Sequence, residues 1–363
     1  MPLVSHNALP TFERLRRSGQ TVLETGRALH QHIRELHIGL LNMMPDAALE
    51  ATERQFFRLV GESNPIAQFY MHPFTLNQLP RGDGARKHIS RYYDTFDQLQ
   101  RDGLDALIIT GATPTHPDLS QEPFWEPLKE VVEWANSNVT STLCSCLTTH
   151  AVLQSVHQQR RTPLGFKRWG VFPHQVVDRS HPLVHDVNTH FDVPHSRFNE
   201  ITREQFERAG LHILVESEVA GVHLAVSRDR IRWVYFQGHP EYDTVSLWKE
   251  FKREVLSYAA GQRDDFPVFP NHLFQPRERA ILNEFRMRLE EAMAAGRDIP
   301  ALPDELIIGR LNNTWHDTAE AIISNWIGTV YQLTHQERNR PFMDGIDPAD
   351  PLGLGLHARE AVQ

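Results

Sequence analysis

Three short apolar runs, at Leu36–Asn42, Leu104–Thr110 and Val139–Ser145, set the strongest limit on how this chain can fold. Each run has the length of a buried strand and is rich in residues that favour strands. Helical patterns lie between or after the runs, at 48–60, 125–136 and 148–157. Because strands that alternate with helices form parallel βαβ units, we predict an α/β protein with a doubly wound, mostly parallel sheet flanked by helices.

The pattern changes after Gly170, where the candidate strands become shorter and closer together. They lie at 171–172, 211–215, 223–226 and 232–236. Such spacing is typical of antiparallel strands, so we expect an antiparallel or mixed part of the sheet. A proline-containing linker at Asp264–Gln275 follows, and then helices are predicted at Arg277–Ala295 and Thr314–Tyr331. The apolar stripe of the second helix is expected to pack either on the core or on another subunit.

These patterns divide the chain into four parts. We expect an N-terminal segment that packs on the core (1–34), a catalytic α/β domain (35–262), a C-terminal helical extension of the same domain (263–346) and a mobile tail (347–363). Asp243 or Thr244 is expected to cap the helix that runs through Val255.

Charge and cysteine content narrow the class of protein. The net charge is −9, from 37 basic and 46 acidic residues, whereas nucleic-acid binding needs a basic surface. The two cysteines, Cys144 and Cys146, would point to opposite faces of a strand, so a disulfide between them is not expected. No signal peptide or apolar run of about 18 residues is present. We therefore expect a soluble, cytoplasmic protein that binds neither nucleic acid nor membrane.

Cys146 is the first candidate for chemistry, because it lies between a buried strand and a helix. A side chain at such a turn is exposed above the sheet, and the partial positive charge of a helix N-terminus favours the nucleophilic thiolate. The backbone N–H of Leu147 could stabilise an oxyanion. A buried structural cysteine explains this segment equally well.

The segment Gly238–Glu241 is the second candidate, since His239 could act as the base and Glu241 could orient its ring. A surface histidine in a turn is the alternative. Gly111 and Ala112 follow the strand at Leu104–Thr110, and a backbone amide there could be a second oxyanion donor. A plain turn glycine is the alternative at that position.

Other histidines do not have the spacing of a metal site. His150, His157, His174 and His195 match no standard zinc pattern, and no phosphate-binding glycine motif is present. We predict no metal and no resident cofactor.

Several blocks together resemble the homoserine O-succinyltransferases, which belong to a homoserine O-acyltransferase family that also has acetyl-transferring members. The blocks, in order, are 41–45, 110–112, 139–143 with Cys146, 194–197, 238–243, 313–315 and 324–326. The resemblance covers nearly the whole chain and implies a class I glutamine amidotransferase-like, flavodoxin-like fold. It also implies an enzyme of methionine biosynthesis that moves succinyl from succinyl-CoA to the hydroxyl of L-homoserine.

The resemblance also assigns roles to individual residues. It implies that Cys146 carries the acyl group, that His239 is the general base and that Glu241 supports it. Positions that match the family's substrate-binding residues are Lys167, Ser196 and Arg253. Ordinary solvated charge is the alternative for Lys167 and Arg253. The family is commonly dimeric, so a homodimer is expected.

The resemblance also indicates the acyl donor, through the residue at one position. Glutamate after the Thr-Gly-Ala block is associated with acetyl transfer, and the matching residue is the neutral Thr115, which favours succinyl-CoA. The chain departs from the family at Leu147, His150, Asp46 and Cys144, where the family commonly has other residues. These departures leave acetyl-CoA as an alternative donor and L-serine as a conceivable acceptor.

Two other functions fit part of the pattern. A glutaminase would share the fold and the Cys-His-Glu arrangement, but such enzymes usually have glycines beside the cysteine, where this chain has Ser145 and Leu147. A non-catalytic binding module would be expected to have lost one of the three residues, and all three are present.

Overall fold

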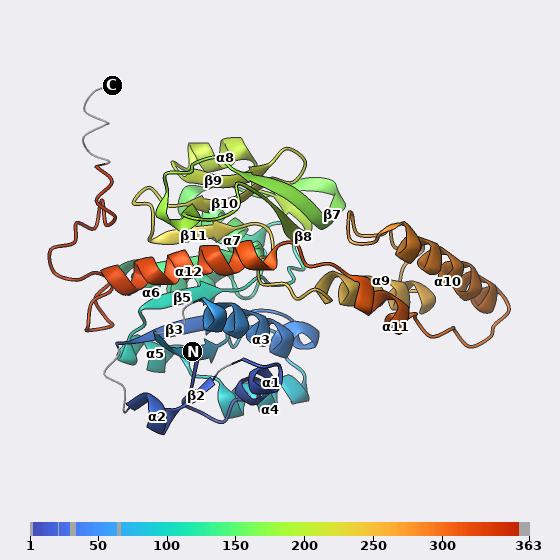
Figure 1. Ribbon diagram of the computed structural model, residues 1–363, viewed down its shortest axis with the longest axis horizontal. Helices are drawn as coiled ribbons and strands as arrows, with labels where there is room; N and C mark the ends of the chain where they lie inside the picture. Colours follow the sequence, from blue (N-terminus) through green and yellow to red (C-terminus); the bar gives the residue numbers. More distant parts are fainter. Residues whose placement is uncertain (1–2, 21, 30–33, 64–66, 356–363) are drawn as a thin grey trace.

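The computed structural model describes residues 3–20, 22–29, 34–63 and 67–355, and it contains a single sheet in the order β2-β1-β4-β3-β5-β6-β11-β10-β9-β7-β8 (Figure 1). Pairing is parallel from β2 through β11 and antiparallel from β11 through β8. The strands are β1 (Leu3–Ser5), β2 (Val22–Glu24), β3 (Glu35–Leu41), β4 (Gln68–Phe74), β5 (Ala106–Ile109), β6 (Ser141–Ser145), β7 (Thr162–Val176), β8 (His190–Glu200), β9 (His212–Ser217), β10 (Gly221–Val226) and β11 (Trp233–Phe236). The predicted α/β class, with a mostly parallel sheet and an antiparallel part after Gly170, is confirmed.

The three apolar runs form the centre of the parallel section as β3, β5 and β6. Nearly all their side chains are buried, because helices cover both faces of the sheet. A strand buried on both faces has a continuous apolar sequence rather than an alternating one. That is why these strands could be recognised without their neighbours.

Helices lie on both faces, as the doubly wound arrangement requires. They are α1 (Pro10–Arg17), α2 (Thr25–Leu29), α3 (Asp46–Glu62), α4 (Asp83–Tyr92), α5 (Phe96–Asp102), α6 (Trp125–Asn138), α7 (Leu147–His157), α8 (Arg203–Arg208), α9 (Ser246–Ala259), α10 (Pro276–Ala294), α11 (Asp304–Ile307) and α12 (His316–Leu333), with 3₁₀ turns η1 (Leu119–Gln121), η2 (Pro182–Val184) and η3 (Ile308–Arg310). One core cluster joins the sheet to α1, α3 and α12. A second joins it to α5, α6, α7 and α8.

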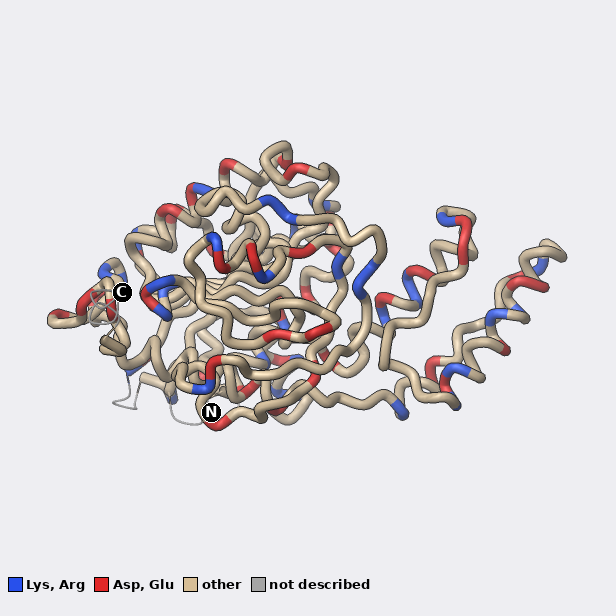
Figure 2. The backbone as a smooth tube through the Cα atoms, turned by 90° about the horizontal axis from the view of Figure 1, so that it is seen from above, with Lys and Arg blue, Asp and Glu red and all other residues tan. Residues whose placement is uncertain are grey.

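The chain after α9 leaves the body of the protein and then returns to it. Helices α9, α10 and α11 share a separate core cluster, which includes Trp248, Phe251 and Phe285, and they project to one side in Figure 1. Acidic and basic residues are interspersed along the projecting part and along the rest of the described chain (Figure 2). Asn271 ties the projecting segment to β7, since its backbone exchanges two 2.8 Å hydrogen bonds with Trp169 and Val171.

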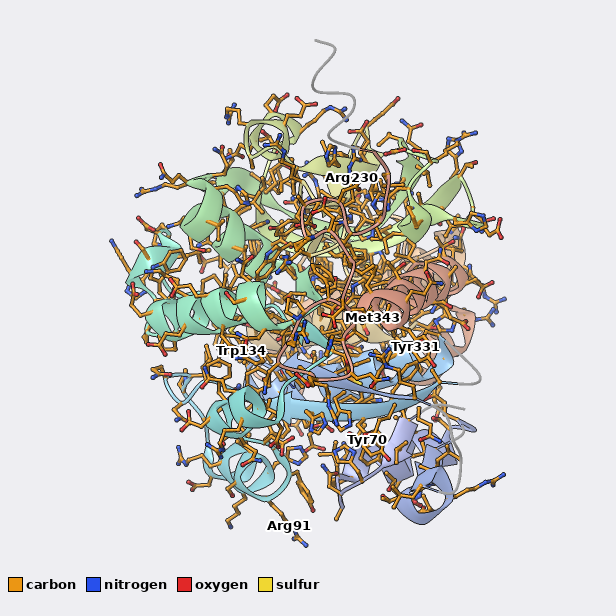
Figure 3. All side chains as sticks on the ribbon, turned by 90° about the vertical axis from the view of Figure 1, so that its left-hand side faces the viewer. Tyr70, Arg91, Trp134, Arg230, Tyr331 and Met343 are labelled. Atoms are coloured by element: carbon orange, nitrogen blue, oxygen red, sulfur yellow. The ribbon has the colours of Figure 1, made fainter. Side chains whose placement is uncertain are left out.

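Helix α12 packs on the core of the same chain, which decides between the two placements expected for its apolar stripe. Ile322 and Trp326 are 2% and 0% exposed, and both belong to the first core cluster. Beyond α12 the chain folds back, so that the nitrogen of Met343 donates to the oxygen of Leu333 at 2.9 Å. Met343 therefore lies near the end of this helix, as does Tyr331 (Figure 3).

The first and last described segments of the chain both contact this body. The N-terminal segment contributes β1 and β2 to the edge of the sheet, and Phe12 of α1 is buried in the first core cluster. In the tail that was expected to be mobile, residues 347–355 form turns, and Leu352 packs against the same cluster. Residues 356–363 lie outside the described part. No helix in the described ranges is both long and apolar enough to cross a membrane.

The expected cap of α9 is wrong. Val245 occupies the N-cap position, and no side chain caps the helix. Asp243 instead pairs with Arg54 and Arg58 of α3. Thr244 accepts a 3.3 Å hydrogen bond from Asn313. Two strong cations on a neighbouring helix compete for the Asp243 carboxylate, and local cap patterns carry no information about such distant partners.

Candidate active site

Cys146 occupies a strained turn between β6 and α7. Its φ of 52° and ψ of −108° place a non-glycine residue in a region that costs about 1–3 kcal/mol and that clusters at functional sites. Its nitrogen donates to the oxygen of Phe236 at 2.8 Å. The side chain is partly exposed, whereas Cys144, one residue before, is fully buried. Cys146 therefore stands at the carboxyl ends of adjacent strands, where α/β proteins bind ligands.

Two threonines fix the first turn of α7 behind the cysteine. Thr148 donates to the oxygen of Thr110 at 2.6 Å, which ties α7 to the end of β5. Thr149 donates to the oxygen of Phe236 at 2.8 Å, which ties it to the end of β11. Both hydroxyls are buried. These bonds hold the positive end of the helix against Cys146, where it favours a thiolate.

His239 and Glu241 lie on the turn after β11 and reach the same point. The Nδ1 of His239 is 2.8 Å from Oε1 of Glu241, and His239 and Cys146 line the same cavity and interact electrostatically. Burial lowers the pKa of His239, but the nearby Cys146 and Glu241 outweigh it, so the pKa is raised well above its usual range. These contacts favour the imidazolium form of His239.

Both the ring and the backbone of His239 are held in place. The ring stacks on Tyr242 with 4.3 Å between the ring centroids, and the backbone nitrogen donates to the oxygen of Pro194 at 2.8 Å. One oxygen of Glu241, Oε2, is buried without a hydrogen-bond partner in the described part of the chain. Glu241 is thus committed to His239 through a single oxygen.

The predicted oxyanion donors surround Cys146. A Cβ atom on Gly111 would lie 3.6 Å from the Cβ of Cys146 and 3.8 Å from the nitrogen of Leu147. Leu147 is the first residue of α7, so its N–H has no acceptor within the helix. Ala112 and Cys146 line one cavity, which is described below. The backbone thus brings the donor candidates from β5 and α7 to one place.

A cavity of about 440 Å³ opens in front of this group, and it contains Cys146, His239 and all three residues predicted to bind substrate. Lys167 contacts Glu250 and Glu254 at 3.5 and 3.2 Å and lies 3.8 Å above the ring of Trp169. Ser196 donates to Glu250 at 2.6 Å. Arg253 lines the cavity from α9, and in the described part of the chain it makes no ion pair or hydrogen bond.

Thr115 lies differently from the other predicted residues. It is exposed and is absent from the described lining of the cavity, whereas Thr113 and Pro114 are part of that lining. The nitrogen and the hydroxyl of Thr115 both point to the buried Glu122, with 2.6 Å between the nitrogen and Oε1. Any effect of this position on the acyl group would therefore act through the neighbouring loop.

The sequence analysis did not identify several residues that line the cavity. Tyr242 donates to Glu250 at 2.7 Å, and Glu250 and Glu254 connect Lys167 to α9. Arg161 and Arg197 also line the cavity. Glu250 and Glu254 lie one helical turn apart on the α9 face that carries Arg253, which is the signal that could have revealed them.

Two positions at which the chain departs from the family, His150 and Cys144, lie in different surroundings. His150 lines the cavity and donates from Nε2 to Gln237 at 3.0 Å, while its Nδ1 is buried without a partner among the described residues. Burial, and then the nearby Arg197, lower the pKa of His150 to about 3, so its ring is neutral. Cys144 faces the second core cluster, and burial raises the pKa of its thiol.

Comparison with known proteins agrees with the resemblance seen in the sequence. A family model described as homoserine O-succinyltransferase matches residues 2–336. Homoserine O-succinyltransferase from Allochromatium vinosum is 66% identical over 354 residues, which are 98% of this chain and 99% of that protein. The protein of the same name from Thioalkalivibrio nitratireducens is 66% identical over 352 residues, or 97% of this chain and 99% of that protein.

A solved structure of a glutamine amido transferase from Methylobacillus flagellatus is a more distant match. It has 12% sequence identity and a TM-score of 0.40, and the match covers 82% of this chain and 95% of that chain. The α/β assignment rests on the strand order and pairing given above.

Proposed function

The chain belongs to the homoserine O-succinyltransferase family, and we propose that it moves the succinyl group through a thioester on Cys146. It is an acyltransferase of methionine biosynthesis, and its substrates are the small molecules succinyl-CoA and L-homoserine. The observation that carries the proposed mechanism is that Cys146 and His239 line one cavity, where Glu241 holds Nδ1 of His239 at 2.8 Å.

The first half of the reaction forms the acyl-enzyme. The Cys146 thiolate attacks the thioester carbon of succinyl-CoA, and the negative charge moves to the carbonyl oxygen. The N–H of Leu147 and the backbone at Gly111 and Ala112 stabilise that oxyanion. When the intermediate collapses, the bond to the CoA sulfur breaks, and the imidazolium of His239 supplies the proton that CoA carries away.

The second half transfers the succinyl group to homoserine. Neutral His239 takes the proton of the homoserine hydroxyl while its oxygen attacks the acyl carbon, and the new ester forms as the Cys146 sulfur leaves as a thiolate. Glu241 stabilises the imidazolium that results. All atoms come from the two substrates and the side chains, so we propose no resident cofactor.

The α9 side of the cavity suits the amino-acid acceptor. Arg253, which has no carboxylate partner in the described chain, fits the α-carboxylate of homoserine as a fork. Glu250 and Glu254 are acceptors for its ammonium group, and Lys167 and Ser196 hold Glu250 in place. This arrangement supports an acceptor that carries both charges and a free hydroxyl.

The test is the intact mass of the protein after mixing with succinyl-CoA, and separately with acetyl-CoA, without an acceptor. We expect a succinyl group on Cys146 that L-homoserine removes faster than L-serine. Acetyl alone on Cys146 would make the enzyme an acetyltransferase. No acyl group on Cys146 would contradict the covalent mechanism, and release of glutamate from glutamine would then identify a glutaminase.

We also propose that the enzyme works in the cytoplasm as a homodimer. The mechanism needs Cys146 as a free thiol, and thiols persist in reducing compartments. Light scattering at micromolar concentration would contradict the dimer by giving a mass near 41.8 kDa.

A further inference from the structure

We propose that Arg161 binds the distal carboxylate of the succinyl group and so selects succinyl-CoA over donors without a terminal charge. This inference rests on the acyl transfer proposed above, since it concerns the donor at that same cavity. Arg161 immediately precedes β7 and lines the cavity that contains Cys146.

The guanidinium of Arg161 is fixed but not neutralised by its contacts. Its Nε and Nη2 donate to the oxygen of Pro117 at 3.2 and 3.0 Å, and Nη2 also donates to the oxygen of His116 at 2.8 Å. These acceptors are neutral carbonyls. Within the described chain Nη1 has no hydrogen-bond acceptor, and no carboxylate lies within ion-pair distance of Arg161. The side chain therefore holds one edge ready for an anion.

The other cations of the cavity are committed elsewhere, apart from Arg253. Lys167 lies between Glu250 and Glu254. Arg197 is buried and donates to His195, to backbone oxygens and to Glu200. Arg161 and Arg253 form no ion pair with a carboxylate among the described residues. The proposed substrates bring two carboxylates, one on the succinyl group and one on homoserine, so the charges match one to one.

The surroundings of Arg161 place it at the acyl-donor side. Its guanidinium interacts electrostatically with Glu122 and Asp118, which lie beyond ion-pair distance, and with Cys146. It also interacts with His150, which follows the cysteine by one turn of α7. It also binds the loop at His116 and Pro117, whereas Arg253 lies on α9 beside the proposed acceptor groups. An extended succinyl group places its distal carboxylate carbon roughly 4 Å from its thioester carbon, so a cation near Cys146 is the fitting partner.

Arg161 also explains how an exposed loop could influence the choice of acyl group. Thr115 and the nitrogen of His116 bind Glu122, and Arg161 binds the next carbonyls of the same loop. A change at Thr115 would shift these carbonyls and with them the guanidinium. The loop thus positions Arg161, and Arg161 contacts the substrate.

The experiment compares succinyl-CoA with butyryl-CoA, which has the same chain length and no terminal carboxylate. The rate at which each donor acylates Cys146 is measured by intact mass, for the unchanged protein and for Arg161→Met. We expect the preference for succinyl to fall by roughly 10- to 100-fold, because a half-buried charge partner is lost, while acylation by butyryl-CoA changes little. Arg161→Lys should restore part of the preference.

Arg160→Met is the matched control. Arg160 is the preceding residue, lies outside the described cavity lining, is largely exposed and pairs with Asp118 at 3.3 Å, so its loss should leave the preference unchanged. If Arg161→Met lowered the acylation rate equally with both donors, Arg161 would only stabilise the loop, and the inference would be overturned. An unchanged preference would also overturn it. Failure of the unchanged protein to accept succinyl would instead contradict the proposed function.

Discussion

In the parallel section of the sheet the chain reaches the active site at the ends of strands, whereas in the antiparallel section it reaches the site along the bodies of strands. Gly111 and Cys146 follow β5 and β6, and His239 follows β11, which borders both sections. Lys167 and Ser196 lie within β7 and β8. Strand ends can offer free backbone donors and strained turns, which suit bond making, while strand bodies offer rows of side chains, which suit binding.

The largest expected effect comes from removing the nucleophile at the end of β6. Cys146→Ala should remove acylation by succinyl-CoA and lower kcat by about 10⁴-fold or more, because no other side chain can form the thioester. Cys144→Ala is the matched control, and it should keep acylation because Cys144 is buried away from the cavity. Intact mass after mixing reports both, and an acylated Cys146→Ala protein would refute the assignment.

The second prediction concerns the support of the base. Glu241→Gln should lower the rate of deacylation by about 10³-fold, because the imidazolium loses its counter-charge. The same change removes one of the influences that raise the pKa of His239. Since deacylation needs neutral His239, the rising limb of its pH profile should move to lower pH. A profile that moves to higher pH, or does not move, would contradict this role.

The third prediction tests the body of β7. A Cβ on Gly170 would lie 2.2 Å from the oxygen of Asn271, and Gly170 has φ of 137°, so Gly170→Ala should cost about 2–4 kcal/mol of stability. Gly165→Ala separates the two causes, because Gly165 also has positive φ but has open space around it. Thermal unfolding should show the larger loss for Gly170→Ala, and equal losses would mean that backbone conformation alone matters.

The smallest expected effect concerns substrate binding by the body of β8. Ser196→Ala removes the 2.6 Å hydrogen bond to Glu250 and should raise the KM for L-homoserine by roughly 10-fold, which corresponds to the loss of one hydrogen bond to a charged group. The rate of acylation by succinyl-CoA should not change. If acylation slowed as much as KM rose, the division between strand ends and strand bodies would fail at this residue.

Each section contains strands that the sequence predicted and strands that it did not. The strands β3, β5 and β6 were found because both of their faces are buried, so the apolar runs are continuous. Strand β8 was missed, since it is polar, contains Pro194 and forms the edge of the sheet. Strand β4 was missed although it is buried and lies inside the sheet, because a histidine and Pro73 interrupt its apolar run. Their pairing is decided by distant neighbours rather than by their own composition.

The sequence by itself determined the α/β class and the family, and it identified Cys146, His239 and Glu241 as candidates, because each of these depends on short patterns of neighbouring residues. The tertiary structure alone decided which side chains meet the nucleophile from far away. Arg161, Glu250 and Tyr242 are ordinary polar residues in the sequence, and they face one cavity only because β7, α9 and the turn after β11 converge there. Proximity of that kind is set by packing over long separations, which no local pattern encodes.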